Sequence, residues 1–410
     1  MLRRITVLVG LCALLGATAL GSPASARTSP TLRYAHPNLA GARRVCALPT
    51  KPNVAACMAM VGTTANGRPF VTPNVLPGYG APQFEGAYGL PATAGVPQTI
   101  AIVDAFDDPY ITSDLATYST AWGLPQLPTC PNDSATSCFL VLNQNGLTSP
   151  LPTADSGWGL EISMDVEVAH AICQDCRIEL YEANNSSFAN LETAVNSAAA
   201  RGVQVISNSY GSFGQDCSTT STGGAYNHPH VAITVSAGDS GFGKACPAVL
   251  NTVVAVGGTT LNMSGNTYVS ETVWSGTGAG CSTKEPAKPF QKALGAWKKI
   301  GCTGRGMNDL SADANPNTGA AVYDSDPAWG GWMAVGGTSL SAPLIGAAYA
   351  LAHNTTNWTY PGRSGYDTRS GFRDVKTGND GPCSKAVRCH AAAGYDLPTG
   401  VGTPNGLTGL

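Results

Sequence analysis

Ser339 lies in the part of the sequence best suited to nucleophilic chemistry. Residues 336–343 read GGTSLSAP. Two glycines permit a tight turn, and the apolar, Ala-rich stretch that follows predicts a helix over residues 339–353. The hydroxyl would then lie at the positive end of the helix dipole, where backbone N–H groups can also hold a developing oxyanion. An ordinary serine cap on a core helix fits the same string, so the string alone leaves both possibilities open.

A serine nucleophile needs a partner that takes its proton. Residues 158–170 read WGLEISMDVEVAH, and the sequence predicts a helix over residues 161–173. Glu161 and Asp165 are four residues apart, so they share one face of that helix. Two like charges at this spacing among apolar residues cost free energy. Next to the Ser339 string, they favour a proton-sharing carboxyl pair over a solvated acidic face.

The elements around these residues alternate between strands and helices. A further helix is expected over residues 189–201, and apolar runs predict strands at 99–104, 177–181, 203–207, 231–236 and 252–256. This alternation predicts an α/β fold, a parallel sheet flanked by helices on both faces. Chemistry in such folds gathers at the carboxyl ends of strands. Here those ends are Asp104 and the polar or Gly-rich stretches 208–211 and 237–241.

Four motifs, in one order, resemble the sedolisins, serine-carboxyl peptidases with a subtilisin-like fold. They are the strings WGLEISMD (158–165), AGDSG (237–241), RGMNDLSA (305–312) and GTSLSAP (337–343). Asn308 departs from the usual proline of the third motif. Subtilisin-like peptidases share the fourth motif, but their His-Gly-Thr-His helix start is absent. The resemblance covers residues 78–410 and implies one catalytic domain.

The resemblance implies a role for each matched residue. Ser339 would attack the scissile carbonyl, and Glu161 would take its proton as general base. Asp165 would hydrogen bond to Glu161, and Asp239 would donate to the oxyanion. A donor carboxyl must be protonated, so activity is expected between about pH 3 and 5.

Residues 208–211 follow a predicted strand and resemble the family's substrate-binding segment. Ser209, Tyr210 and Gly211 would pair through their backbone with an extended peptide. A plain strand-to-turn connection is the alternative.

Two C-terminal stretches, 372–379 and 392–400, resemble the calcium loops of the family. Asp374 and Asp396 would supply charge to one structural Ca²⁺, which prefers six or more oxygen ligands. The carbonyls of Val375, Ala392 and Gly394 would supply most of the rest. Two metal-free Gly/Asp turns are the alternative.

The N-terminus predicts export. Residues 1–26 combine two arginines, a short apolar stretch and Ala24-Ser25-Ala26, which is typical of a secretory signal peptide. Twelve cysteines follow it, an even number that favours disulfides in a secreted, extracellular protein. Pairing in sequential order gives modest loops, with Cys173–Cys176 a structural disulfide and a redox CxxC as its alternative. Residues 27–77 are expected to be a short propeptide or N-terminal extension, and autocatalytic removal at low pH is a hypothesis.

The charge composition argues against some classes of binding partner. Charged residues make up 12% of the chain and the formal net charge is −3. No long basic block exists, which argues against nucleic acid and anionic membranes as partners. We expect a monomer acting on peptides or proteins.

Three other functions remain open. Asp104 and His170 could serve Ser339 in a subtilisin-like triad. Ser240, in Gly238-Asp239-Ser240-Gly241, could be a chymotrypsin-like nucleophile. An inactive, surface-binding relative is the third.

Overall fold

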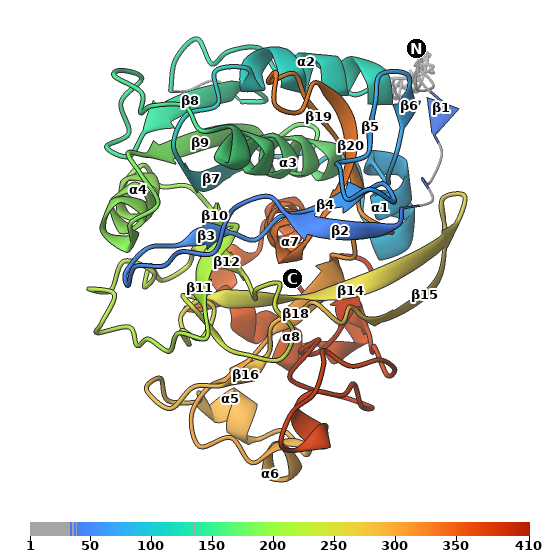
Figure 1. Ribbon diagram of the computed structural model, residues 1–410. Coiled ribbons are helices and arrows are strands. Elements are labelled where there is room, and N and C mark those ends of the chain that lie inside the picture. The colour runs from blue at the N-terminus through green and yellow to red at the C-terminus, as the bar shows by residue number, and fades with distance from the viewer. Residues whose placement is uncertain (1–32, 35–36, 38, 134–135) are drawn as a thin grey trace, which may run out of the picture.

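A central sheet of eight strands organises the chain (Figure 1). The computed structural model describes residues 33–34, 37, 39–133 and 136–410, so the predicted signal peptide lies outside the described residues. The order is β15-β14-β12-β10-β7-β9-β8, with β18 also on β14. All neighbours are parallel except β15, which is antiparallel to β14. The strands are β7 (Thr99–Ala105), β8 (Phe139–Asn143), β9 (Arg177–Ala183), β10 (Val205–Asn208), β12 (Ala232–Ser236), β14 (Val254–Ser264), β15 (Thr267–Val273) and β18 (Leu310–Asp313).

Helices cover this sheet. The two central ones are α3 (Ser156–Ile172) and α7 (Thr338–Ala352), which pack against each other. α3 also contacts β7, and α7 contacts β10 and β12. The remaining long helices are α1 (Ala81–Tyr88), α2 (Ile111–Trp122) and α4 (Phe188–Ala200). The predicted α/β, subtilisin-like fold with one catalytic domain is confirmed.

The prediction for the start of α3 was wrong by five residues. The helix begins at Ser156 because the Asp155 side chain accepts hydrogen bonds from the N–H groups of Gly157 and Trp158. Two glycines in the first turn, Gly157 and Gly159, weaken the local helical signal, but the cap compensates for them. Glu161 is consequently in the second turn of the helix rather than at its start.

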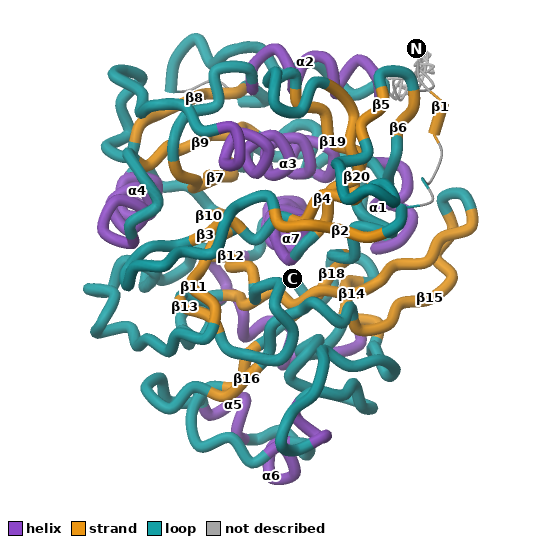
Figure 2. Tube along the Cα trace, viewed as in Figure 1, coloured by secondary structure: helices purple, strands orange, loops and turns teal. Residues whose placement is uncertain are grey.

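Strands of the N-terminal segment pair with strands from later in the chain (Figure 2). β2 (Gly41–Arg44), β4 (Met60–Thr63) and β5 (Val71–Thr72) form a sheet with β20 (Gly331–Gly336) and β19 (Ala320–Asp324). β3 (Ala56–Cys57) pairs with β11 (Tyr210–Phe213), which also pairs with β13 (Ala245–Cys246). These pairings continue across the expected boundary at residue 78, so the segment belongs to the same folded unit. Its removal stays a prediction.

All six predicted disulfides are present. They join Cys46–Cys57, Cys130–Cys138, Cys173–Cys176, Cys217–Cys246, Cys281–Cys302 and Cys383–Cys389. Each closes a short loop, because every cysteine from Cys46 onwards bonds to its neighbour in sequence.

Short elements complete the fold. They are β1 (Arg33–Tyr34), β6 (Val75–Leu76), β16 (Gly280–Cys281), β17 (Gly306–Met307), β21 (Phe372–Arg373), β22 (Thr403–Pro404), α5 (Pro289–Lys292), α6 (Trp297–Ile300) and α8 (Ser364–Asp367). Within the described ranges, none of the helices has the length and apolar character needed to span a membrane.

Candidate active site

Ser339 lies in the first turn of α7, fully buried. Gly337 precedes the helix with φ 96°, a conformation that disfavours residues with a side chain. The Ser339 hydroxyl donates to the backbone carbonyl of Ser209 at 3.0 Å. Its backbone N–H donates to the carbonyl of Met58 at 3.1 Å. The predicted nucleophile therefore meets a backbone carbonyl from the N-terminal segment.

Glu161, Asp165 and Asp104 form a buried group of carboxyls between α3 and β7. None of their oxygens accepts a hydrogen bond from a donor within the described residues. Burial raises the pKa of Glu161 well above its usual value, and the charges of Asp165 and Asp104 raise it further. The nearby Ser339 hydroxyl opposes that pKa shift.

The pKa values of the other two carboxyls are raised as well, by burial first. The charges of Asp165 and Glu182 raise that of Asp104 further. The structure thus brings the predicted pair together and adds Asp104. The sequence had pointed to Asp104 as the carboxyl end of a strand, but it had given Asp104 a catalytic role only in the rival triad.

Asp239 lies beside the start of α7, in the loop after β12. Its Oδ1 accepts hydrogen bonds from Thr338 N and Oγ1, both at 2.8 Å, so it caps the helix from a distant segment. Its Oδ2 is buried and accepts no hydrogen bond from the part of the chain that the structure describes. Burial raises the pKa of Asp239 to about 7, against the opposing effects of Thr338 and Arg44. A protonated Oδ2 is free to donate, as an oxyanion partner must.

Of the predicted substrate segment, Tyr210 and Gly211 form the start of β11, and Ser209 lies between β10 and β11. The edge of β11 is occupied by β3, with Tyr210 opposite Cys57 and Gly211 opposite Ala56. Tyr210 turns its side chain into the core, where its hydroxyl donates to Asn208 Oδ1 at 2.8 Å. Tyr210 therefore offers only its backbone to a peptide.

Histidine chemistry finds no support here. His170 lies near the C-terminal end of α3, nine residues or about 13 Å along the axis from Glu161. Its Nε2 pairs with the Pro125 carbonyl at 2.8 Å, and burial lowers its pKa to about 4. The rival Ser240 hydroxyl accepts from Arg44 at 2.5 Å.

The predicted calcium loops lie next to each other. Gly394 N donates to Asp374 Oδ2, and Ala392 N donates to Asp396 Oδ2, each at 2.9 Å. Asp374 Oδ1 is buried and, among the described residues, accepts no hydrogen bond. Burial raises the pKa of Asp396 to about 7, and the charge of Asp374 adds to it. Two adjacent carboxylates with a free buried oxygen suit a divalent cation.

Asp380 was missed by sequence reasoning. It is fully buried, and neither of its carboxyl oxygens accepts a hydrogen bond from the described residues. Burial raises its pKa to about 8, and the charge of Asp396 adds to the shift. Nothing in its local sequence distinguishes it from an aspartate in a turn.

Known proteins are similar to this chain in sequence. The model of the subtilase family matches residues 164–375, just over half of the chain. Kumamolisin of Bacillus sp. (strain MN-32) is 28% identical over 362 residues, which cover 78% of this chain and 61% of that protein. Xanthomonalisin of Xanthomonas sp. (strain T-22) is 32% identical over 182 residues, 38% of this chain and 21% of its own. The chain therefore spans less than two thirds of either relative.

A solved structure agrees in fold. Pseudomonas sedolisin, a serine-carboxyl proteinase complexed with two molecules of pseudo-iodotyrostatin, superposes with a TM-score of 0.64 at 24% identity. The match covers 80% of this chain and 95% of that one. The predicted resemblance to sedolisins, with a subtilisin-like fold, is confirmed. The chain belongs to the subtilase family.

Proposed function

We propose that this protein is a secreted, acid-acting serine-carboxyl peptidase. The observation that carries the proposal is the buried Ser339 hydroxyl at the start of α7, beside the uncompensated carboxyls of α3. Glu161 is the general base, Asp165 shares its proton, and Asp239 is the oxyanion donor. The substrates are peptides or proteins.

Each step uses one of these groups. Ser339 Oγ adds to the scissile carbonyl carbon while its proton passes to Glu161. Ser339 N–H and the protonated Asp239 donate to the oxygen that gains charge. Glu161 then returns the proton to the leaving amine, and water hydrolyses the ester on Ser339. Asp165 keeps one proton within the pair, so the two carboxyls titrate together.

The pH dependence follows from opposite requirements. Asp239 must be protonated to donate, so activity declines as pH rises through its pKa of about 7. The Glu161–Asp165 pair must lose one proton to provide a base, so activity declines in strong acid. We expect the maximum between about pH 3 and 5. The first proton of the coupled pair must then leave near the unperturbed carboxyl values, and the raised pKa of Glu161 belongs to the second proton.

One structural Ca²⁺ belongs to the proposal. Asp374, Asp396 and the carbonyls of Val375, Ala392 and Gly394 would hold it. The ion would tie the two C-terminal loops together by its charge. The disulfides suit an extracellular protein. A monomeric state is a further part of the proposal.

The test is a pH–rate profile on a mixed peptide library, with Ser339→Ala as blank. A rate maximum at pH 8 would overturn the mechanism. Glu161→Gln is compared with His170→Asn in the same assay. Loss of activity in the first and not the second is expected, and the reverse would favour the histidine triad.

A further inference from the structure

A second group of buried carboxyls lies on α3, away from the catalytic pair. Glu167 follows Asp165 by two residues, which places it about 200° further round the helix. It is on the side of α3 where α2 and β19 pack (Figure 1). Its neighbours are carboxyls from these two elements and from the turn after β7. This group, here called the carboxyl cluster, consists of residues that are at most 3% exposed: Asp108, Asp114, Glu167 and Asp324.

Hydrogen bonds tie the carboxyl cluster to the end of β19. Tyr323 N donates to Glu167 Oε2 at 3.0 Å, and Ser325 N donates to Asp114 Oδ2 at 2.7 Å. One side chain from α3 and one from α2 therefore hold the same short segment, residues 323–325. The position of this segment depends on both carboxyls staying between the helices and the strand.

No positive charge balances the carboxyl cluster. Among the described residues, none of its members forms an ion pair, and Glu167 Oε1 and Asp324 Oδ2 are buried without a hydrogen-bond donor. The other titratable groups around it are acidic or neutral, and they are Asp107, Glu182, Asp326, Tyr118, Tyr323 and His170. Burial lowers the pKa of His170 to about 4, so its ring is neutral above that pH. Only protons remain to neutralise the cluster.

Burial favours the protonated form of these carboxyls. It raises the pKa of Asp108 to about 7 and that of Asp324 to about 8, and it raises the pKa of Glu167 well above its usual value. The charges of the other cluster members add to each shift. An open arrangement that admits water returns these pKa values towards about 4, so opening releases protons. Each proton released makes opening about tenfold more favourable per pH unit.

The carboxyl cluster lies between the two elements that carry the catalytic groups. α3 carries Glu161 and Asp165. The antiparallel hairpin of β19 and β20 begins beside the cluster and ends at Gly336, three residues before Ser339. A shift of this hairpin relative to α3 therefore changes how the nucleophile faces its base.

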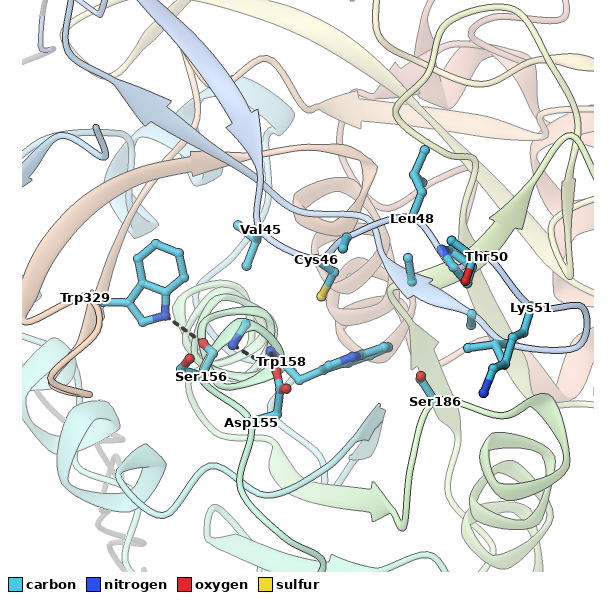
Figure 3. Close-up of a pocket in the computed structure, with 16 residues that line it drawn as sticks. Val45, Cys46, Leu48, Thr50, Lys51, Asp155, Ser156, Trp158, Ser186 and Trp329 are labelled. Carbon is cyan, nitrogen blue, oxygen red and sulfur yellow. Dashed lines mark hydrogen bonds between the residues drawn. The ribbon is translucent and has the colours of Figure 1, made fainter. Parts of the chain in front are cut away.

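The same hairpin contacts α3 at a second point. Trp329, in the connection between β19 and β20, donates its indole N–H to the Ser156 carbonyl at 2.6 Å (Figure 3). Trp329 and Trp158 both line the pocket at this end of α3. The hairpin is thus held on the helix at its strand end by the carboxyl cluster and at its tip by one indole.

We propose that the carboxyl cluster is a pH-sensitive switch that holds the β19–β20 hairpin on α3 in acid and releases it near neutral pH. In acid the four side chains pack without charge between α2, α3 and β19. As pH rises they lose protons, their charges repel, and water enters between the hairpin and the helix. The cluster acts through the position of Ser339 and is separate from the titration of Asp239. Its effect on activity rests on the proposed function, whereas the opening itself does not.

The main test is hydrogen exchange on the purified full chain of Ser339→Ala, which prevents digestion during the measurement. The equilibrium constant for local opening is obtained from the backbone amides of residues 320–336, after correction for intrinsic exchange. At least two protons leave on opening, so this constant should rise at least about 100-fold per pH unit between pH 5 and 6. A smaller rise overturns the inference.

Amide variants in the same background show whether the carboxyl cluster causes the rise. Glu167→Gln with Asp324→Asn keeps both side-chain shapes but removes two titrating groups, so the rise should become about 100-fold smaller per pH unit. Asp324→Asn alone should make it about tenfold smaller, and this single variant decides the matter if the double variant does not fold. A rise equal to that of the parent contradicts the inference.

Glu271→Gln is the matched control. Glu271 is also a buried carboxyl with a raised pKa, but it accepts hydrogen bonds from three hydroxyls and lies outside the carboxyl cluster. The pH dependence of opening in residues 320–336 should not change in this variant. A change as large as that of Asp324→Asn would show that the amides report global unfolding, and it would overturn the inference.

A bound cation is the competing explanation for a group of buried acids. Hairpin opening is therefore measured at pH 7 with and without added Ca²⁺ or Mg²⁺, in Ser339→Ala that also carries Asp396→Asn to remove the proposed C-terminal calcium site. No effect of either ion is expected. Suppression of opening by an ion would identify the cluster as a cation site and overturn the switch.

The effect on activity is measured with the active enzyme. Wild type and the double amide variant are held at pH 7.5, and samples are assayed at pH 4 on the peptide library. Wild type should lose activity at least tenfold faster, and equal rates of loss contradict the inference. If no peptide is hydrolysed although the hairpin opens as expected, the proposed function fails and the switch stands. If peptides are hydrolysed but opening is the same in parent and amide variants, only the switch fails.

Discussion

Glu161 and Asp309 are both buried carboxyls, yet the fold surrounds them in different ways. Arg305 contacts Asp309 through two N–H donors, at 2.5 and 2.9 Å, and Tyr366 and Ala255 N donate to it as well. Glu161 has Asp165 and Asp104 as neighbours and, among the described residues, no ion pair. A compensated buried acid holds structure, whereas an uncompensated one costs stability and is suited to chemistry.

Glu161→Gln sharpens this comparison most. The amide keeps the shape but cannot take the proton of Ser339, so kcat should fall about 10⁴-fold. The free energy of unfolding at pH 7 should stay the same or rise, because burial raises the pKa of Glu161 and this cost to folding is absent with an amide. Peptide assays and urea unfolding measure the two effects. A strongly destabilised variant would show that Glu161 is structural.

Asp309→Asn should have the opposite profile. It leaves the Arg305 guanidinium buried without its counter-charge, which typically costs about 3–5 kcal/mol. Urea unfolding measures the loss. The surviving folded fraction should keep wild-type activity per folded molecule, and a loss of kcat at constant stability would contradict the distinction.

Asp239 is an intermediate case, with one oxygen compensated and one free. Asp239→Ala removes the donor and should lower kcat by about 10²–10³-fold. Asp239→Asn keeps a donor that does not titrate, so part of the activity should return and the decline near pH 7 should disappear. If both variants keep the wild-type pH profile, Asp239 is only a helix cap.

Stability should fall as pH rises from about 4 to 7. Burial raises the pKa of Asp108 to about 7 and that of Asp324 to about 8. The unfolded chain loses these protons near pH 4, so between the two values the folded state binds more protons. Each such group lowers the unfolding free energy by about 1.4 kcal/mol per pH unit. Urea unfolding of Ser339→Ala at pH 4, 5, 6 and 7 measures the slope, and Asp324→Asn should flatten it. A rise in stability over this range contradicts the prediction.

Calcium removal should have the smallest effect. Free Ca²⁺ at a concentration about 100 times its Kd would stabilise the fold by roughly 3 kcal/mol. A chelator added at pH 6.5 should therefore lower Tm by several degrees. Asp396→Asn should lower Tm and abolish the response to chelator. Identical responses of wild type and Asp396→Asn to the chelator would show that these loops do not bind the metal.

Local sequence predicted the parts of the site that lie on one element. Glu161 and Asp165 share a face because a helix repeats every 3.6 residues, whatever surrounds it. Ser339 was placed at a helix start by its glycines and its apolar continuation. The six disulfides were predictable because each joins neighbouring cysteines. The start of α3 was missed because its cap, Asp155, outweighs two glycines.

What only the tertiary structure decided are the contacts between distant segments. Asp239 caps α7 across 99 residues, Asp104 joins the α3 carboxyls from β7, and the Met58 carbonyl meets Ser339 from the N-terminal segment. No local pattern encodes these meetings, because they depend on the register of strands that pair only in the folded sheet. The sequence by itself determined which groups can react, and the fold decided which of them meet.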